Sequence, residues 1–326
     1  MTRSVRRSLC IGLSLAGAAA VVPGLARAQA WPARPLRIVV PYPAGGAPDA
    51  TARRIAEKLS AQLGQPVVVE NRPGGSAVIG AKAVSSAPAD GYTLLYLSSA
   101  HATVQAISGR LDLEKEFAPI ARTGTSPFIA VVNASAPWTN LRAFLDEVRA
   151  QPGKLTYGTA GVGSPAHIAV ERIRERVPGL DLLQVPFKGA VESANALAGG
   201  QIDFSVSVLG AILPHLKSGR LRALALTTPE RLAVLPEVPT MVQAGVAGYA
   251  FDAWGGFAAP AGTPEEIVLR LHAAIVRGAA EADYRAYADS VGQQVSVSAS
   301  PQAFAVEIRE TVARERETVG RLGLKG

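Results

Sequence analysis

Residues 41–49 read Pro-Tyr-Pro-Ala-Gly-Gly-Ala-Pro-Asp, a glycine-rich turn between two regular elements. The largely apolar run 36–40 predicts a buried strand before the turn, and apolar residues at helical spacing over 52–63 predict a helix after it. A strand, a tight turn and a helix N-terminus in this order present free backbone N–H groups to an anion. An ordinary connecting loop is the alternative, since the stretch is neither a P-loop nor a dinucleotide fingerprint. We interpret the turn as a candidate anion site.

Individual residues of the turn have separate physical roles. Gly45 and Gly46 carry no Cβ, so a ligand can approach the backbone there. Pro48 suits the first position of the helix, where a missing N–H is tolerated. Asp49 falls in the first helical turn, where the helix dipole favours a carboxylate. Because a second anion beside an anionic ligand would repel it, we expect Asp49 to brace the loop and not to contact the ligand.

The first 28 residues have the pattern of a secretory signal peptide. Basic residues at 3–7 precede a short apolar segment over 10–22, and Ala26-Arg27-Ala28 is a small-residue cleavage signal. The apolar segment is shorter than the roughly 20 residues of a membrane-spanning helix. We therefore predict export to the periplasm with cleavage near Ala28, by either the general secretory or the twin-arginine route.

The charge of the chain excludes one class of partner. The leader holds four arginines and no acid, so the remaining chain has 29 basic and 26 acidic residues. These charges are not gathered into a basic patch, and we expect no nucleic-acid partner. The single cysteine, Cys10, lies in the leader, so the exported protein has no disulfide and no thiol chemistry.

Strand-like and helix-like segments alternate through most of the chain, which predicts an α/β fold. A first series runs from residue 36 to 97, and a second begins at Phe128–Val132. Two such series, each with a glycine-rich turn, predict two lobes that face each other across a cleft. We place the signal peptide at 1–28, the first lobe at 29–125 and 228–326, and the second lobe at 126–227.

Two further polar segments follow predicted strands. Ser98, Ser99 and His101 come after the strand at 92–97, at the strand end where open α/β sheets bind ligands. Residues 158–165 form a second glycine-rich turn between a strand and a helix.

The second turn ends on Ser164 and Pro165, which suit the N-cap and the first helical position. Capping and ligand contact are equally compatible with Ser164. We expect His167, in the helix that follows, to hydrogen-bond the nearby loop. Tyr42 and Trp254 are candidates for the cleft walls, with a place in the core as the alternative.

No pattern of catalytic residues stands out. The glycines around Ser164 do not form the G-x-S-x-G turn of a hydrolase nucleophile. No His, Cys, Asp or Glu cluster has metal-ligand spacing. We therefore predict no catalytic residue, no metal and no cofactor.

Taken together, these stretches resemble the Bug/TctC family, the exported solute-binding components of tripartite tricarboxylate transporters. The matching motifs cover nearly the whole exported chain in order: VPYPAGGAPD (40–49), VVVENRPGG (67–75), ADGYTLL (89–95), FAPI (117–120), QPGKLTYGTAGVGSPAHIAVE (151–171), VPFKGAVESANALAGGQIDF (185–204), PHLKSGRLRALALTTPERLAVLPEVPTMVQAG (214–245) and FAAPAGTP (257–264).

The resemblance implies a type II periplasmic-binding-protein fold, or Venus flytrap, in which each lobe is a mixed sheet flanked by helices. It also implies that backbone N–H groups of the first turn hold a carboxylate and that the second turn closes over it. Asp49 and His167 are the expected loop-bracing residues. The expected ligand contacts are Tyr42, Ala44, Gly45, Gly46, Ala47, Ser98, Ser99, His101, Thr159, Gly161, Gly163, Ser164, Phe187 and Ser207.

The chain departs from the family pattern at three positions. Pro48 stands where Ser or Thr is common, which removes a hydroxyl and an N–H from the first turn. Phe187 stands where Tyr is usual, so a phenolic hydrogen bond is missing. Ser207 stands where the family often has Asp, which argues against an amino-acid ligand.

The function implied is that of a periplasmic receptor for a small organic carboxylate. A dicarboxylate, tricarboxylate, acidic amino acid or aromatic acid all fit this description. The expected partner is the membrane permease of a tripartite tricarboxylate transporter, with a membrane sensor kinase as the alternative. We expect a monomer whose lobes hinge near residues 123–128 and 226–229.

Overall fold

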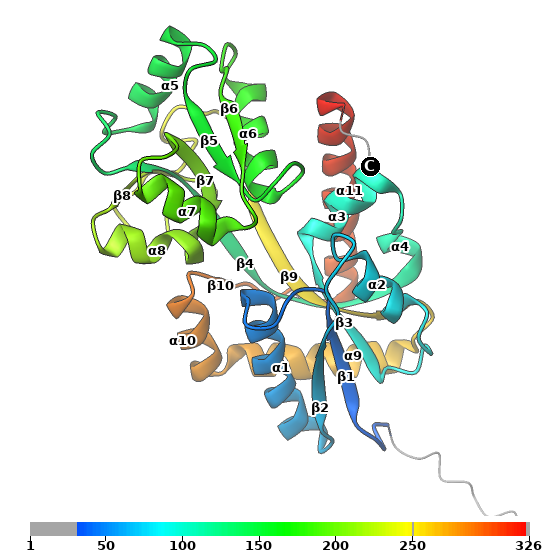
Figure 1. The fold of residues 1–326 in the computed structure, drawn as a ribbon. Helices are drawn as coiled ribbons and strands as arrows, with labels where there is room; N and C mark the ends of the chain where they lie inside the picture. The colour runs from blue at the N-terminus through cyan, green and yellow to red at the C-terminus, as the bar shows by residue number, and fades with distance from the viewer. Residues whose placement is uncertain (1–30, 250, 324–326) are drawn as a thin grey trace, which may run out of the picture.

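The structure, a computed structural model, consists of two lobes (Figure 1). It describes residues 31–249 and 251–323, so the predicted signal peptide lies outside the described residues. Within these ranges, no helix is both long enough and apolar enough to cross a membrane. The larger lobe carries both ends of the described chain.

The first lobe consists of β1 (Leu36–Val40), α1 (Ala47–Leu63), β2 (Val67–Asn71), α2 (Val78–Ser85), β3 (Thr93–Ser98), α3 (Ser99–Ser108), α4 (Leu113–Glu116), β9 (Asp252–Pro260), α9 (Glu265–Ala280), α10 (Ala282–Ser290), β10 (Gln294–Val295) and α11 (Pro301–Leu322). The second consists of α5 (Leu141–Ala150), β5 (Thr156–Thr159), α6 (Pro165–Arg176), β6 (Leu183–Pro186), α7 (Ala190–Ala198), β7 (Phe204–Val208), α8 (Leu209–Lys217) and β8 (Leu221–Leu226). Strand β4 (Phe117–Asn133) belongs to both.

The sheet of the first lobe is mixed, in the order β2-β1-β3-β9-β4, with β10 added to β4. Strands β2, β1 and β3 are parallel, whereas β9 is antiparallel to both of its neighbours. Apolar side chains of α1 and α9 pack on one face, and those of α2, α3 and α11 pack on the other. With both faces covered, β1 and β3 are almost wholly apolar, as buried parallel strands require.

The second lobe repeats this plan around strands β4-β7-β5-β6, with β8 also paired to β4. Helix α5 shows why the sequence folds as it does. Leu141, Phe144, Leu145 and Val148 recur at helical spacing and are buried, while Asn140 caps the helix by accepting a hydrogen bond from the Ala143 N–H at 2.9 Å. Helices α5 and α6 cover one face of this sheet, and α7 and α8 cover the other.

Two strands connect the lobes. Strand β4 pairs with β9 up to Pro127 and with β7 and β8 from Phe128 onward, so the chain changes lobes at this point of the strand. The return follows Phe251, which still packs in the core of the second lobe, and leads directly into β9. The first crossing thus lies within one continuous strand, β4, and the second lies immediately before β9.

Residues 228–251, which we placed in the first lobe, pack on the second. Leu232 and Val238 join the core under α7 and α8, and Met241 and Tyr249 join the core under α5 and α6. The Met241 N–H donates to the carbonyl of Leu226 at 2.7 Å. The segment has no regular period, so its sequence pattern does not indicate the lobe on which its apolar residues are buried.

Candidate ligand-binding cleft

The first glycine-rich turn is held in shape by Asp49. Its carboxylate accepts hydrogen bonds from the Gly45 N–H at 2.9 Å, from Asn71 Nδ2 at 2.9 Å and from Arg53 Nε at 3.0 Å. The Asp49 side chain is only 5% exposed, whereas Arg53 is 52% exposed. Asp49 is therefore committed to the loop, and the Gly45 N–H is occupied by it.

Other backbone groups of the turn face solvent. Helix α1 begins at Ala47 with Gly46 as its N-cap, so Pro48 takes the second helical position and not the first. Ala44, Gly46 and Ala47 are exposed. The N-terminus of α1 thus presents its first N–H groups and the positive end of its dipole to the space between the lobes.

The pKa of the Asp49 carboxyl determines the pH range in which the first turn stays ordered. Burial raises the pKa of this carboxyl, but the hydrogen bonds from Arg53, Gly45 and Asn71 outweigh burial and hold the pKa below its usual range. A carboxyl with a lowered pKa stabilises the fold fully above its ordinary value of about 3.9 and loses that effect as the pH falls through the folded value. Loop order is therefore expected to persist from pH 8 to about pH 5.

Replacing Asp49 by alanine is expected to weaken carboxylate binding about tenfold, the effect of losing roughly 1.4 kcal/mol of loop-ordering hydrogen bonds. Titration calorimetry at pH 7 measures this. Asp146→Ala, which removes an exposed carboxylate of α5, is the control and should leave affinity unchanged. Equal affinities of wild type and Asp49→Ala would show that the brace does not shape the site.

The segment after β3 lies beside this turn. The Tyr42 hydroxyl and Ser98 Oγ are 2.7 Å apart, and the Asn71 side chain donates to the Tyr42 carbonyl at 3.2 Å. Ser98 is the N-cap of α3, and its N–H donates to His101 Nδ1 at 3.1 Å. The structure therefore brings Tyr42, Ser98, Ser99 and the first turn to one edge of the sheet, as the sequence predicted for the carboxyl ends of β1 and β3.

His101 is fully buried in this arrangement. Its ring packs edge-on against Tyr42, with 6.1 Å between ring centres, and burial lowers its pKa to about 4. The imidazole is neutral near pH 7, and its Nδ1 lone pair caps the α3 backbone. In this conformation His101 supports Tyr42 and the start of α3 from within the core. Direct ligand contact by its side chain stays a prediction.

The second turn is braced in a similar way. Thr159 Oγ1 accepts from the Gly161 N–H at 3.2 Å and from Gln184 Nε2 at 2.8 Å. His167 Nδ1 accepts from the Gly163 N–H at 3.0 Å, and Ser164 Oγ caps α6 by accepting from the His167 N–H at 3.4 Å. The loop is thus ordered before any ligand arrives.

The state of His167 follows from its surroundings. Burial lowers its pKa; Glu171, whose Oε1 lies 3.7 Å from His167 Nε2, acts in the opposite direction, and Arg174 adds to the lowering. The net effect keeps the ring neutral at pH 7, which leaves Nδ1 free to accept from Gly163. Tyr157 also donates to Glu171, at 3.2 Å, so the brace is anchored in the core of the second lobe.

Phe187 and Ser207 lie deeper than the two turns. The Phe187 N–H donates to the Thr159 carbonyl at 2.9 Å, and its ring fills the space beside Gly158. Ser207 is 2% exposed on β7, opposite Ile129 of β4. Trp254 is 4% exposed and donates from Nε1 to Thr311 at 3.2 Å, so it belongs mainly to the core. Ligand contact by Phe187 and Ser207 stays a prediction.

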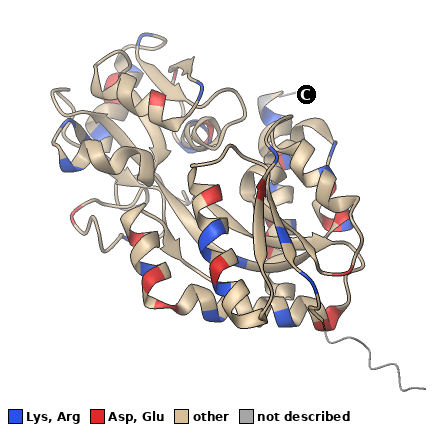
Figure 2. Cartoon of the chain, turned by 60° about the horizontal axis from the view of Figure 1, so that its bottom comes forward, with Lys and Arg blue, Asp and Glu red and all other residues tan. Residues whose placement is uncertain are grey.

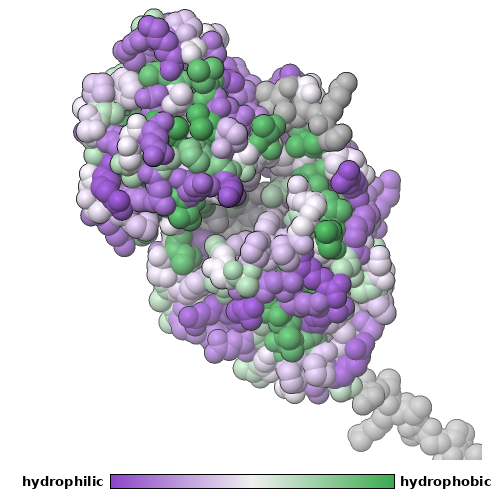
Figure 3. Space-filling model, in the orientation of Figure 1, coloured by the Kyte–Doolittle hydropathy of each residue, from purple (hydrophilic) through white to green (hydrophobic). Residues whose placement is uncertain are grey.

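The two lobes meet beside the predicted site. A Cβ on Gly163 would lie 2.9 Å from Ile107 Cδ1, so the second turn already rests against α3 of the first lobe. Figure 3 shows the surface hollowed between the lobes. A cavity of about 470 Å³ opens on this side, lined by α3, α6 and α11 and containing Ser99 from the predicted set.

Sequence reasoning missed the charged lining of this cavity, which includes Arg172 of α6 and Arg314 of α11. Both residues lie in helices rich in alternating charges, a pattern typical of a solvated face. In Figure 2, acidic and basic residues are interspersed along the chain in both lobes. No group of His, Cys, Asp and Glu side chains among residues 31–249 and 251–323 could hold a metal ion.

Comparison with known proteins defines the family. The profile of the tripartite tricarboxylate transporter family receptor matches residues 51–324. Protein BugT of Bordetella pertussis is 34% identical over 266 residues, which cover 80% of this chain and 81% of BugT. A Rhodopseudomonas palustris protein solved with adipate has a TM-score of 0.79 and 31% identity, and the match covers 90% of this chain and 99% of that one. MatC from Rhodopseudomonas palustris, solved with bound malate, has a TM-score of 0.74 and 30% identity, over 88% and 99%.

The two lobes, each a mixed sheet flanked by helices, are those of a periplasmic solute-binding protein of the Venus flytrap type. The chain belongs to the tripartite tricarboxylate transporter receptor family, in which the Bug proteins are its relatives. The resemblance read from the sequence is confirmed. This family is one of solute receptors and not a class of enzymes.

Proposed function

We propose that this protein binds a small organic carboxylate between its lobes and delivers it to a tripartite tricarboxylate-type permease. The observation that carries the proposal is the pair of braced, glycine-rich turns at the N-termini of α1 and α6, one in each lobe. Adipate and malate, each a dicarboxylate, are bound by two relatives of the same fold.

The proposed mechanism uses backbone groups as the anion receptor. The N–H groups of Ala44, Gly46 and Ala47 anchor the carboxylate together with the dipole of α1. Each charge-assisted hydrogen bond contributes about 1.5–3 kcal/mol, so three of them hold a carboxylate without an arginine. Ser98 and Ser99 border the same place, and the second turn, Thr159–Ser164, closes over the solute.

Closure requires a hinge, and the two interlobe strands supply one. Each crossing, at Pro127–Phe128 and after Phe251, is a single chain segment, whose backbone angles can change without disturbing either core. The first crossing lies within the predicted hinge at 123–128. The second lies later than the predicted 226–229, because residues 228–251 are packed on the second lobe.

Delivery to a permease and signalling to a membrane sensor kinase are the two candidate uses of the closed form. Family membership favours the permease. The protein acts as a monomer in the periplasm in this proposal, after cleavage near Ala28. The absence of an acidic group at Ser207 favours a ligand without an amino group.

A thermal-shift screen tests the proposal. The exported chain, residues 29–326, is heated with adipate, malate, citrate, glutamate and benzoate, and with the amide of each acid. A ligand at a hundredfold excess over its Kd stabilises the native state by about 2.7 kcal/mol. We expect a shift with at least one acid and none with its amide. Equal shifts with acid and amide would contradict the carboxylate anchor, and no shift with any acid would contradict the ligand class.

A further inference from the structure

The side chains that line the cavity between α3, α6 and α11 carry a net positive charge. Four arginines and three glutamates line it, which leaves one guanidinium in excess. Arg321 pairs with Glu175 at 2.8 Å and with Glu317 at 3.0 Å, and Arg176 also pairs with Glu175, at 3.3 Å. In these ion pairs, each charged group at the rim of the cavity has a partner of opposite charge.

Glu315 is the third carboxylate, and it is buried at the meeting point of the lobes. Its Oε1 accepts from Arg172 Nη2 at 2.8 Å, and its Oε2 accepts from Thr103 Oγ1 at 3.0 Å. The side chains of Arg172 and Glu315 are 11% and 6% exposed. Arg172 comes from the second lobe, whereas Thr103 and Glu315 come from the first.

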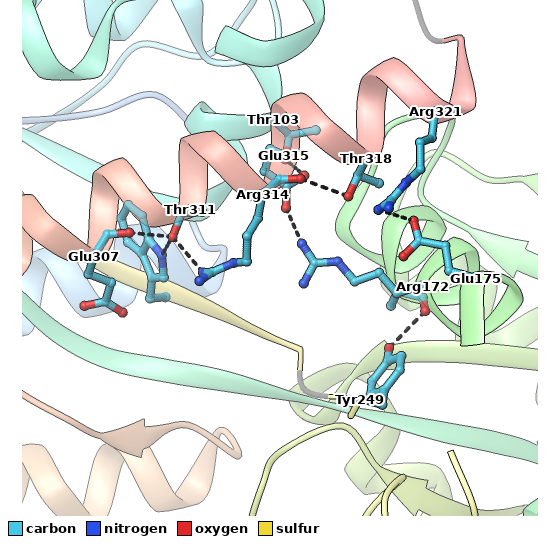
Figure 4. Close-up of polar contacts among 12 residues, drawn as sticks. Thr103, Arg172, Glu175, Tyr249, Glu307, Thr311, Arg314, Glu315, Thr318 and Arg321 are labelled. Atoms are coloured by element: carbon cyan, nitrogen blue, oxygen red, sulfur yellow. Dashed lines mark hydrogen bonds and ion pairs between the residues drawn. The ribbon is translucent and has the colours of Figure 1, made fainter. Parts of the chain in front are cut away.

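Arg314 supplies the excess charge. Its Nη2 donates to Thr311 Oγ1 at 3.2 Å, and within the described parts of the chain it has no carboxylate at ion-pair distance. Figure 4 shows Arg314 descending from α11 toward Thr311, while Arg172 of α6 reaches Glu315. The two side chains line one cavity, and both act on the charge of Glu315.

We propose that this cavity is a second solute site, which takes a small organic carboxylate between Arg314 of the first lobe and Arg172 of the second. A guanidinium presents a planar pair of N–H donors that matches a carboxylate. Arg172 and Arg314 together have more N–H donors than the Glu315 carboxylate can accept, so donors remain for a ligand. The volume of about 470 Å³ lies in the range of sites for small molecules. Ala100, Pro165, Pro229 and Phe251 supply apolar wall for the body of the ligand.

This site adjoins the proposed cleft and shares Ser99 with it, but it uses a different set of anion-binding groups. Its lining contains none of the backbone groups of residues 44–47 or 159–164, and it recognises the anion by side chains instead of N–H groups. A solute held by one arginine from each lobe would couple occupancy of this site to the angle between the lobes. The inference therefore goes beyond the proposed function and does not depend on it.

The test uses benzoate as the probe and benzamide as its neutral analogue of the same shape. Titration calorimetry is performed in the Gly46→Val background, in which the proposed cleft is blocked. Arg314→Gln removes the unpaired charge, and Arg316→Gln, which removes an exposed arginine of the same helix outside the cavity, is the matched control. Arg314→Lys keeps the charge but not the planar fork.

We expect benzoate to bind and benzamide not to bind. Arg314→Gln should weaken benzoate at least about tenfold, Arg314→Lys should weaken it less, and Arg316→Gln should leave it unchanged. Equal binding of benzoate and benzamide, absence of benzoate binding, or an Arg314→Gln variant that binds as well as Arg316→Gln would overturn the proposal. Failure of the carboxylate anchor in the cleft appears elsewhere, as a thermal shift with adipate or malate that Gly46→Val leaves unchanged and that persists when Arg314→Gln is added.

Discussion

Replacing Gly46 by valine is expected to weaken carboxylate binding at least about 100-fold while leaving the protein folded. The substitution places a branched side chain over the N–H groups of Gly46 and Ala47, and losing two charge-assisted hydrogen bonds costs about 3 kcal/mol or more. The fold should tolerate it. Gly46 has an extended backbone at φ −79°, and a Cβ there would meet its nearest neighbours, Pro43 and Pro48, at 3.7 Å.

Affinity and melting temperature measured on the same samples check this expectation. Gly320→Val is the control, because Gly320 lies on α11 with open space around its Cβ position. It should change neither quantity. Gly46→Ala, which adds only one methyl group, should lose less affinity than Gly46→Val. If Gly46→Val binds the carboxylate like wild type, the first turn is not part of the ligand site.

Replacing Arg172 by methionine is expected to lower the free energy of unfolding by about 3 kcal/mol at pH 7.5. The substitution leaves the buried Glu315 carboxylate without its charged partner, and breaking one side of a buried ion pair typically costs about 3–5 kcal/mol. The packing of the Arg172 guanidinium over the Phe251 ring, 5.0 Å from its centre, is lost as well. Urea denaturation measures the change.

The sign of the pH dependence follows from Glu315. Burial raises the pKa of this carboxyl, and Arg172 counteracts the effect of burial. Without Arg172 the pKa rises further, so Glu315 takes up a proton at a higher pH and the buried charge disappears. The cost of Arg172→Met should therefore be largest at pH 7.5 and smaller at pH 5.

The double variant Arg172→Met with Glu315→Met separates this cause from a loss of packing. Removing both charges leaves no unpaired group, so most of the stability should return. If the double variant is as unstable as Arg172→Met alone, the cost comes from the arginine stem and not from the charge of Glu315.

Local rules predicted the elements of the fold from the chain itself. The helical spacing of Leu141 to Val148 and the apolar run of β1 leave few alternatives for those segments, because burial selects the period that places apolar groups on one side. The two glycine-rich turns were likewise visible, since they join a strand to a helix in each lobe. Asp49 and His167 were expected to brace the turns, and the structure shows the atoms that Asp49 and His167 bind.

What the sequence determined by itself is therefore the family, the α/β alternation and the glycine-rich turn of each lobe, each encoded in residues close together in the chain, while the export signal stays a prediction. Only the tertiary structure decided the rest. It placed residues 228–251 on the second lobe, buried His101, and brought Arg172 to Glu315 across 143 positions of sequence. These features depend on which distant surfaces meet, and nothing in a local period or turn specifies the partner that a charged or apolar side chain will find.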